Sequence, residues 1–255
     1  MAPRVERRPV HVGTAGWSVP APHAEHFPVV GSHLERYALA LPAVEINTAF
    51  YRDHRRATYE RWAATVPAEF RFAVKVPRRL THEARLGAPP AELHAFLDGV
   101  EGLGGKLGVL LVQLPPSLAL DERVAWRFLE ALRARWPGGT ACEPRHPSWF
   151  TPAGQRLLEE FHVARVAADP AVVPEAGEPG GWPGLRYWRL HGSPAMYHSA
   201  YDAAFLAALA ERLRRETPAA DVWCIFDNTA EFHAAVNALA LHALLAGGDG
   251  PADRL

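Results

Sequence analysis

The feature that most constrains this chain is a regular alternation of short apolar, β-rich runs with amphipathic helical stretches. Eight such runs occur along the 255 residues, a spacing of about 32 residues per unit. Parallel strands need long crossovers, and eight β/α units of roughly 250 residues are typical of a closed barrel. We therefore predict an α/β fold, a single TIM-type (β/α)8 barrel, with a doubly wound open sheet as the alternative. The predicted strands are Val10–Gly13, Val44–Asn47, Phe70–Val76, Val109–Leu114, Thr140–Glu143, Val163–Asp169, Leu185–His191 and Val222–Asp227.

Helix start signals precede several of the crossovers. The predicted N-caps are Asp121, Thr151, Asp202 and Thr229. One crossover has no helical pattern: Pro170–Gly184 is rich in proline and glycine. We expect this segment to replace the sixth helix as a loop over one end of the barrel. The prediction is one domain over residues 1–246, followed by a flexible polar tail at 247–255.

Composition excludes several classes of protein. The formal net charge of -1 does not suit a strongly basic nucleic-acid coat protein, and 49% hydrophobic residues suit a globular protein with a full core. Cys142 and Cys224 lie in apolar runs, as buried thiols of a reducing compartment do. No run approaches the roughly 20 apolar residues of a membrane helix. We expect a cytoplasmic protein that does not enter a membrane.

Polar residues end most of the predicted strands. In a barrel the active site forms at the carboxyl ends of the strands, so these side chains are expected to converge at one mouth. They form either a self-neutralising structural network or a ligand site, and their gathering at one end favours a site. The residues at or just after the strand ends are Glu45, Asn47, Tyr51, Lys75, Gln113, Glu143, Arg145, Trp149, Asp169, Arg189, His191, Tyr197, Asp227 and Asn228.

Lys75 is the most informative of these residues. Only two of the 27 lysines and arginines are lysines, and Lys75 lies at a predicted strand end, whereas Lys106 lies in a glycine-rich loop. A lysine at that position suits a compact or titratable ammonium, which could contact an anion, act as a general acid or form a Schiff base. Together with Glu143 and His191 it makes up the predicted catalytic group.

Two other kinds of ligand are open at this stage. Glu143, Asp169, His191 and Asp227 include metal-ligand types, but neighbouring lysine and arginine would repel a cation, so no cofactor is expected and a divalent metal is the alternative. Arginines and loop aromatics are also how single-stranded nucleic acids are held. The basic residues after the second and third strands are Arg52, His54, Arg55, Arg56, Arg78, Arg79 and Arg85, and the loop aromatics are Trp17, Tyr51, Trp149, Trp182 and Tyr197.

Seven ordered blocks between Val10 and about Leu245 carry a family resemblance. They are VHVGTAGW, EINTAFY, FAVKVP, LLVQLPPS, EPRHPSWF, YWRLHG followed by Tyr197, and FDNTAEFHAAVNA. The chain resembles the YecE-like family, domain of unknown function seventy-two. The resemblance implies a TIM-type barrel of unestablished activity, with a suggested relation to the endonuclease IV and xylose isomerase barrels.

The resemblance also implies particular positions and shows two departures. The family's EFRHPSW is EPRHPSW here, and its paired asparagines are Asp227-Asn228. The dense ligand set of a multi-zinc endonuclease is absent from the sequence, so that chemistry is not carried over. The positions that match are Asn47, Tyr51, Lys75, Gln113, Glu143, Arg145, Trp149, Arg189, His191 and Asn228.

Three functions compete. The first is an enzyme that binds a small anionic, phosphate-bearing substrate and uses Glu143 and His191 for acid/base catalysis. The second is a nucleic-acid-binding barrel without metal chemistry, and the third is a metal-dependent sugar isomerase. The predicted substrate-binding residues are Asn47, Tyr51, Gln113, Arg145, Trp149, Arg189, Tyr197, Asp227 and Asn228.

Overall fold

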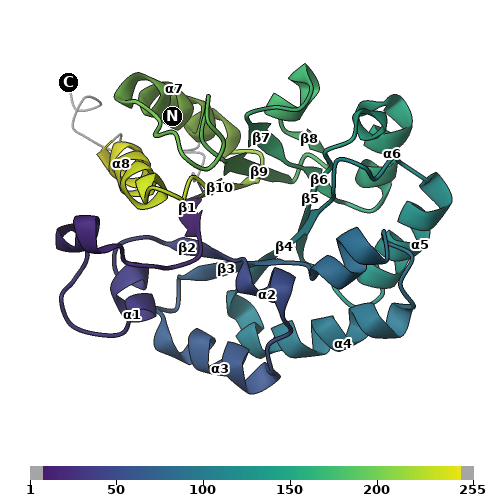
Figure 1. Ribbon diagram of the computed structural model, residues 1–255, viewed down its shortest axis with the longest axis horizontal. Coiled ribbons are helices and arrows are strands. Elements are labelled where there is room, and N and C mark those ends of the chain that lie inside the picture. Colours follow the sequence, from purple (N-terminus) through teal and green to yellow (C-terminus); the bar gives the residue numbers. More distant parts are fainter. Residues whose placement is uncertain (1–7, 248–255) are drawn as a thin grey trace, which may run out of the picture.

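The computed structural model describes residues 8–247 and shows a strand barrel surrounded by helices (Figure 1). Ten strands form one sheet. Their bounds are β1 (Val10–Ala15), β2 (Ala43–Ile46), β3 (Arg71–Lys75), β4 (Leu107–Gln113), β5 (Gly139–Glu143), β6 (Ala164–Arg165), β7 (Ala167–Asp169), β8 (Gly180–Gly181), β9 (Leu185–Leu190) and β10 (Asp221–Phe226).

The strand order confirms a TIM-type barrel. The sheet runs β7-β9-β10-β1-β2-β3-β4-β5-β6-β8, and every pair is parallel except β6 with β8. The predicted sixth run is split at Val166 into two strands: β6 pairs with β5, and β7 pairs with β9. Because one continuous run leaves β5 and joins β9, the barrel is nearly closed at this point.

Helices cover the outside of the barrel, as the alternating pattern predicts. Three of the predicted caps are confirmed: the Asp121 carboxylate accepts from the amides of Arg123 and Val124, and Thr151 and Asp202 cap their helices in the same way. The helices are α1 (His33–Ala38), α2 (Thr48–Tyr51), α3 (Arg56–Thr65), α4 (Pro90–Val100), α5 (Glu122–Arg133), α6 (Pro152–Glu160), α7 (Ala203–Glu216) and α8 (His233–Gly247).

The predicted start of the last helix is wrong by three residues, since an N-cap at Thr229 would start the helix at Ala230. Phe232 has φ 64°, in the left-handed region that an α-helix does not use, so a helix cannot run through it from Thr229. Helix α8 therefore begins at His233, and the Ala234 amide donates to the Asn228 carbonyl oxygen across the turn. Of the predicted tail at 247–255, residues 248–255 lie outside the described residues.

The Pro/Gly-rich segment does replace the sixth helix, but it does not lie over an end of the barrel. After β7 it makes a short 3-10 turn, Pro174–Gly177, and then returns antiparallel to β6 as strand β8. The Trp182 amide donates to the Val163 carbonyl oxygen at the start of the split run. In Figure 1 the segment lies in the outer ring, between α6 and α7. It therefore occupies the side of the barrel where a crossover helix would be.

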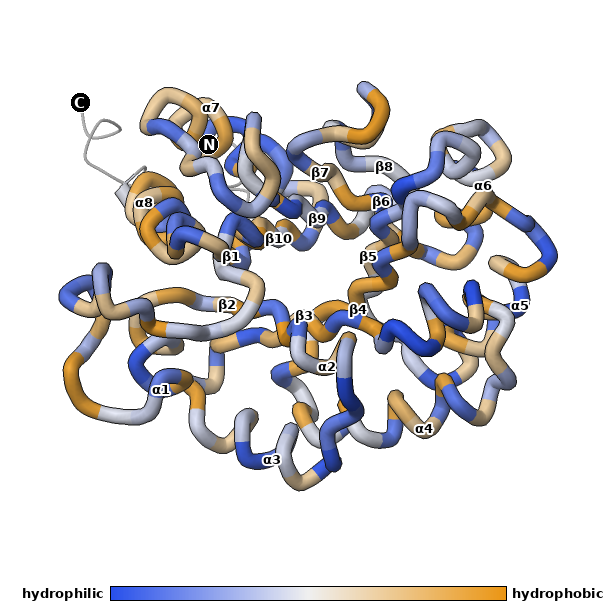
Figure 2. The backbone as a smooth tube through the Cα atoms, in the orientation of Figure 1, coloured by the Kyte–Doolittle hydropathy of each residue, from blue (hydrophilic) through white to orange (hydrophobic). Residues whose placement is uncertain are grey.

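Alternation along the strands creates two separate apolar layers. One lies between sheet and helices, and the other fills the lower barrel interior; Figure 2 shows β4 and β5 as mostly hydrophobic. Gly108 is required inside, because a Cβ there would lie 2.4 Å from the Trp223 ring. The interior cluster consists of Ala43, Ala73, Val109, Leu111, Ala141, Ala164, Val166, Leu185, Tyr187, Trp223 and Ile225. This apolar layer is the floor of the site.

Candidate functional site at the barrel mouth

The polar side chains of the mouth continue the inward alternation of the interior cluster. Two residues beyond an inward apolar side chain, each of these strands places a polar side chain on the same face. Thus Lys75 follows Ala73, Gln113 follows Leu111, and Glu143 follows Ala141. Glu45, Arg189 and Asp227 follow Ala43, Tyr187 and Ile225 in the same way.

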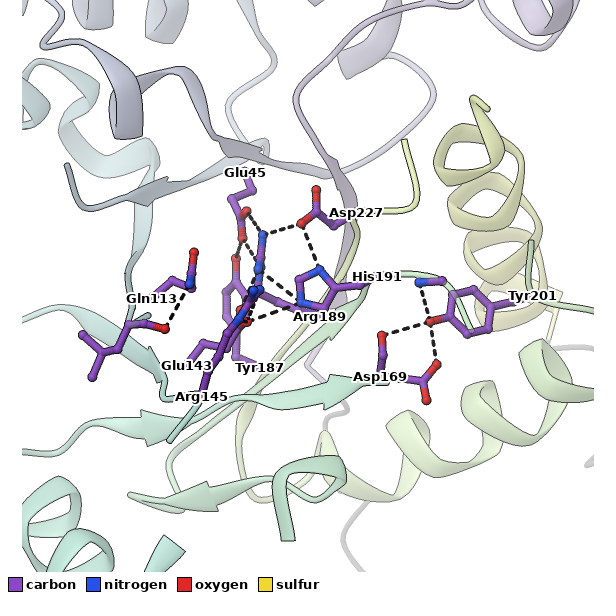
Figure 3. Close-up of polar contacts among 12 residues, drawn as sticks. Glu45, Gln113, Glu143, Arg145, Asp169, Tyr187, Arg189, His191, Tyr201 and Asp227 are labelled. Atoms are coloured by element: carbon purple, nitrogen blue, oxygen red, sulfur yellow. Dashed lines mark hydrogen bonds and ion pairs between the residues drawn. The ribbon is translucent and has the colours of Figure 1, made fainter. Parts of the chain in front are cut away.

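Arg189 is the centre of this polar layer (Figure 3). It has no exposed surface, and its guanidinium contacts three carboxylates. It donates through Nη2 to Glu45 Oε1 at 2.7 Å and through Nη1 to Glu143 Oε2 at 2.6 Å. It also donates through Nε to Glu45 at 3.1 Å and through Nη2 to Asp227 Oδ2 at 3.0 Å. All three carboxylates therefore share one buried cation.

His191 lies between two of the same carboxylates. Its Nδ1 is 3.0 Å from Asp227 Oδ2, and its Nε2 is 3.4 Å from Glu143 Oε1. Burial alone would lower the pKa of His191, but the charge of Glu143 and the hydrogen bond to Asp227 raise it above its ordinary value. Both ring nitrogens face carboxylate oxygens, an arrangement that favours the protonated imidazole.

The carboxylates are held ionised. Burial would raise the pKa of Glu143, but Arg189, His191 and Arg145 together hold that pKa well below its ordinary value. The pKa of Asp227 is lowered in the same way, because Arg189 and His191 outweigh its burial. Arg145 donates to Glu143 Oε1 through Nε at 2.8 Å and has 19% of its side chain exposed. It is the part of this network that faces the open mouth.

Lys75 is the cation of the mouth without a carboxylate of its own. Its Nζ lies 4.1 Å from the centre of the Phe50 ring, and within residues 8–247 no acid lies at ion-pair distance from it. Burial, reinforced by the charge of Arg189, lowers the pKa of Lys75 to about 8. The ammonium is therefore easily deprotonated and free to meet a ligand.

Charge at the mouth does not balance. Glu45, Glu143 and Asp227 carry three negative charges, which Arg189, Arg145 and protonated His191 neutralise. Protonated Lys75 adds one positive charge beyond neutrality. A buried excess charge is costly unless a counter-charge reaches it, so the mouth is suited to an anion.

Two amide oxygens near the strand ends lack partners. Among the described residues, the Oδ1 atoms of Asn47 and Asn228 are buried and accept no hydrogen bond. Asn228 has no exposed surface, and its Nδ2 donates to the Ser199 carbonyl oxygen and to Asn237 Oδ1 on α8, so its side chain is directed toward α8. Leaving an acceptor such as Asn47 Oδ1 unpaired costs on the order of 1–3 kcal/mol, which a ligand hydroxyl or amine would recover.

The loop after β9 covers one side of the mouth. Gly192 adopts φ 94°, and a Cβ there would lie 2.9 Å from the Ser199 carbonyl oxygen, so the tight turn requires glycine. The turn brings the Tyr197 ring edge-on to His191, with centroids 5.9 Å apart, and leaves Tyr197 38% exposed. Tyr197 is thus placed where a bound molecule would touch it.

The other predicted residues divide between mouth, surface and core. Gln113 is buried and donates from Nε2 to its neighbour's carbonyl oxygen at 3.1 Å, and Tyr51 is 77% exposed on α2. Trp149 is different: it is 2% exposed, and its indole N–H donates to the Leu118 carbonyl oxygen. The structure therefore places Trp149 in the core between sheet and helices.

Asp169 does not join the mouth, contrary to the sequence prediction. Ala164 and Val166 point into the barrel, so Ala167 and Asp169 point outward, one residue out of phase with the prediction. Asp169 Oδ2 accepts a 2.7 Å hydrogen bond from the Tyr201 hydroxyl, well apart from Arg189 in Figure 3. Asp169 therefore helps to anchor the loop before α7.

Glu45 was expected at the mouth without an assigned role, and two further contributors, Tyr187 and His82, were not predicted. Glu45 makes the bidentate contact to Arg189, and the Tyr187 hydroxyl donates to Glu45 Oε2 at 2.9 Å. His82 packs edge-on against the Phe50 ring; burial and the charges of Lys75, Arg78 and Arg145 lower its pKa to about 4. Strand alternation could have included Tyr187, whereas nothing in the sequence points to His82.

The cluster is not arranged as a metal centre. Within the described part of the chain, no three histidine, cysteine, aspartate or glutamate side chains are placed to hold a metal ion. The Arg189 guanidinium itself lies among Glu45, Glu143 and Asp227, where a divalent cation would have to lie. The three carboxylates therefore already surround the Arg189 guanidinium, which occupies the place that a metal ion would need.

Among residues 8–247, three of the seven residues of the predicted basic rim pair with acids. Arg56 contacts Glu60 and Glu101, Arg78 contacts Glu83, and Arg79 contacts Asp53 and Glu92. These arginines are therefore partly neutralised.

Beside the mouth, a cavity of about 210 Å³ opens at the end of β1 and is lined by Gly16, Ser18 and Thr229, among others. No described helix is long and apolar enough to span a membrane.

Fold and site together define a TIM-type barrel with an incompletely neutralised charge cluster at the carboxyl ends of its strands. A family model described as "Protein of unknown function DUF72" matches residues 11–253. The chain belongs to this family, which confirms the resemblance found in its sequence.

Curated relatives and solved structures agree with this membership. The UPF0759 protein YecE of Escherichia coli K12 is 29% identical over 170 residues, which cover 64% of this chain and 60% of YecE. The UPF0759 protein YunF of Bacillus subtilis is 27% identical over 154 residues, 56% of this chain and 53% of YunF. The matches thus span less than two thirds of these relatives.

The structural likeness extends over nearly the whole chain. A DUF72 family protein from Enterococcus faecalis V583 superposes with a TM-score of 0.76 at 24% identity, covering 93% of this chain and 95% of that one. A DUF72 family protein from Thermotoga maritima MSB8 has a TM-score of 0.72 at 25% identity, covering 94% and 100%.

Proposed function

We propose that this protein is an enzyme that binds a small anionic, phosphate-bearing substrate at the barrel mouth and acts on it by acid/base catalysis. The observation that carries the proposal is the unpaired cation Lys75 beside a cluster in which every carboxylate is already paired. A structural network would close on itself, whereas this one leaves a positive charge for which only a ligand can supply the partner.

The geometry supports different roles for the predicted catalytic residues. His191 is assigned as the proton donor, because its pKa is raised and both of its ring nitrogens face carboxylate oxygens. Glu143 stays ionised and orients His191 and Arg145. Lys75 contacts the anion as an ammonium and, with a pKa of about 8, accepts a proton at mildly alkaline pH.

The remaining residues bind or position. Arg145 and Tyr197 face the open side of the mouth, and Asn47 offers a free acceptor to a substrate hydroxyl, whereas the fully buried Asn228 acts by holding the Ser199 loop and α8. Arg189 has no surface left for substrate, so it acts through Glu143 and Asp227 as a positioning residue. The substrate is thus expected to meet the Lys75 ammonium, the Arg145 guanidinium and the proton donor His191.

Calorimetric titration with inorganic phosphate and with glycerol 3-phosphate tests the proposal. Lys75→Met should weaken binding by roughly tenfold or more, because it removes a charge-assisted contact. The matched control is Arg127→Met, which removes one exposed positive charge on α5, away from the mouth. Equal binding by Lys75→Met and the parent protein, or no binding of either anion, would contradict the proposal.

Gel retardation of DNA and RNA at about 50 mM salt distinguishes the proposed small-anion site from a nucleic-acid-binding function. Nucleic-acid binding would be visible at this salt concentration and would fall steeply with added salt.

A further inference from the structure

We propose that Lys75 is a covalent catalytic residue and that the substrate is an aldehyde or ketone with an anionic group, which Lys75 captures as a Schiff base. This inference rests on the proposed function, because it names the substrate class of the same site. It starts from the contrast between the two lysines of the chain.

Lys106 shows what a structural lysine looks like in this protein. Its Nζ donates to the carbonyl oxygens of Ala63 and Val66, both at 2.6 Å, which ties α3 to the start of β4. These two hydrogen bonds fix the amine against the backbone. Lys106 therefore has a structural role and is not poised to meet an electrophile.

Lys75 has the opposite surroundings. It points into the barrel from the end of β3, and its nearest described contact is the face of the Phe50 ring rather than a carbonyl or carboxylate oxygen. A ring face stabilises a cation less than an ion pair does, and it leaves the Nζ hydrogens uncommitted. Desolvation without a paired acid is how proteins keep a lysine amine nucleophilic near neutral pH.

The same mouth holds the other groups that imine formation needs. The neutral amine attacks the carbonyl carbon and a C–N bond forms as the carbonyl π electrons move to oxygen. The nitrogen then loses one proton and the oxygen gains one, which gives a neutral carbinolamine. That hydroxyl then leaves as water after receiving a second proton, and the nitrogen lone pair closes the C=N bond. His191, protonated between Glu143 and Asp227, is a proton donor on this mouth.

A Schiff base also explains why a lysine stands here in a chain that otherwise uses arginine. Arginine would bind an anion at least as well, because its guanidinium is always charged and forks toward phosphate. It cannot form an imine at neutral pH. Arg145 already supplies a guanidinium at this mouth, so anion binding alone does not require a second cation of a different kind.

Reductive trapping tests the inference on the intact protein. We would incubate it at pH 7.5 with glycolaldehyde phosphate and sodium cyanoborohydride, which delivers hydride to the iminium carbon and leaves a stable secondary amine. Peptide mapping by mass spectrometry then assigns the modified lysine. Because the pKa of Lys75 is about 8 against an ordinary value of roughly 10.4, its neutral fraction exceeds that of a normal lysine on the order of a hundredfold.

The expected result is an adduct on Lys75 that forms roughly tenfold or more faster than any adduct on Lys106, and faster with glycolaldehyde phosphate than with unphosphorylated glycolaldehyde. Lys75→Arg should keep phosphate binding and lose this adduct. Equal labelling of the two lysines, or phosphate binding without an adduct on Lys75, would overturn the inference. The second outcome leaves the proposed anion site intact, so the two proposals can fail separately.

Discussion

At the scale of single residues, Arg189 decides how the acids of the mouth behave. It is fully buried and contacts Glu45, Glu143 and Asp227 at once. Removing it would leave three carboxylates together in a dry site, where they must protonate or admit water. Arg189 therefore stabilises the fold by preventing the large free-energy cost of three unpaired buried carboxylates, and not as the sum of three independent ion pairs.

Arg189→Met should lower the free energy of unfolding by about 3–5 kcal/mol at pH 7, the range found when one partner of a buried ion pair is removed. Urea denaturation measures the change. Arg127→Met, which removes an exposed arginine, should stay within about 0.5 kcal/mol of the parent protein. A loss below about 1 kcal/mol for Arg189→Met would show that the network is open to water.

Lys75 should behave in the opposite way, because its ammonium is desolvated without an acid partner. Lys75→Met should leave the free energy of unfolding unchanged or raise it by about 1 kcal/mol at pH 7. The folded pKa of about 8 lies below the unfolded value, so the penalty on the ammonium is full below pH 8 and disappears as pH rises toward about 10.

Urea denaturation of the parent protein and Lys75→Met at pH 7 and pH 9.5 measures this trend. The difference in the free energy of unfolding between the two proteins should be smaller at pH 9.5 than at pH 7. A Lys75→Met protein that is clearly less stable at both pH values would show that Lys75 has a structural role, which would remove the main support for the anion site.

At the scale of strands and helices, the barrel floor depends on the absence of a side chain on β4. A Cβ at Gly108 would lie 2.4 Å from the Trp223 ring, which is itself completely buried. Gly108→Ala should cost about 1–3 kcal/mol through overpacking. Gly105→Ala is the matched control, because nothing lies within 4 Å of a Cβ there. Thermal unfolding compares the two, and equal melting temperatures would contradict this packing.

Alternation explains both what could be predicted of the site and what could not. Glu143, Arg189, His191 and Asp227 were placed correctly at the mouth, because apolar runs fix which face of each strand is inward. Asp169 was misplaced, because the prediction put Ala167 and Asp169 on the inward face, which Ala164 and Val166 occupy in the structure. The pairing of Glu45 with Arg189 joins residues 144 positions apart, which no local pattern encodes.

Loops were harder to predict than strands, for a different reason. Trp149 and Tyr197 both follow strand ends as aromatic loop residues, yet one is buried and the other lies over His191. Loop conformation sets this difference: Gly192 turns the chain back over the mouth, whereas the Trp149 indole is fixed by the Leu118 carbonyl oxygen. Neither loop conformation produces a periodic pattern in the sequence, so neither could be predicted in the way that strand alternation can.

At the scale of the whole molecule, a formal net charge of -1 conceals an uneven distribution. Arg56, Arg78 and Arg79 of the rim pair with nearby acids, while Lys75 at the mouth has no acid at ion-pair distance among residues 8–247. We propose that the positive charge at the mouth attracts small anions to one place.

The most direct measurement uses the scarcity of lysine. Protein labelled with carbon-13 and nitrogen-15 in lysine alone has side-chain NMR signals from two residues, Lys75 and Lys106. On titration with inorganic phosphate at pH 7, the Lys75 signals should shift and saturate, while those of Lys106, bound to two carbonyl oxygens, stay in place. Lys75 signals that do not respond to phosphate, or that drift in parallel with those of Lys106, would contradict the account.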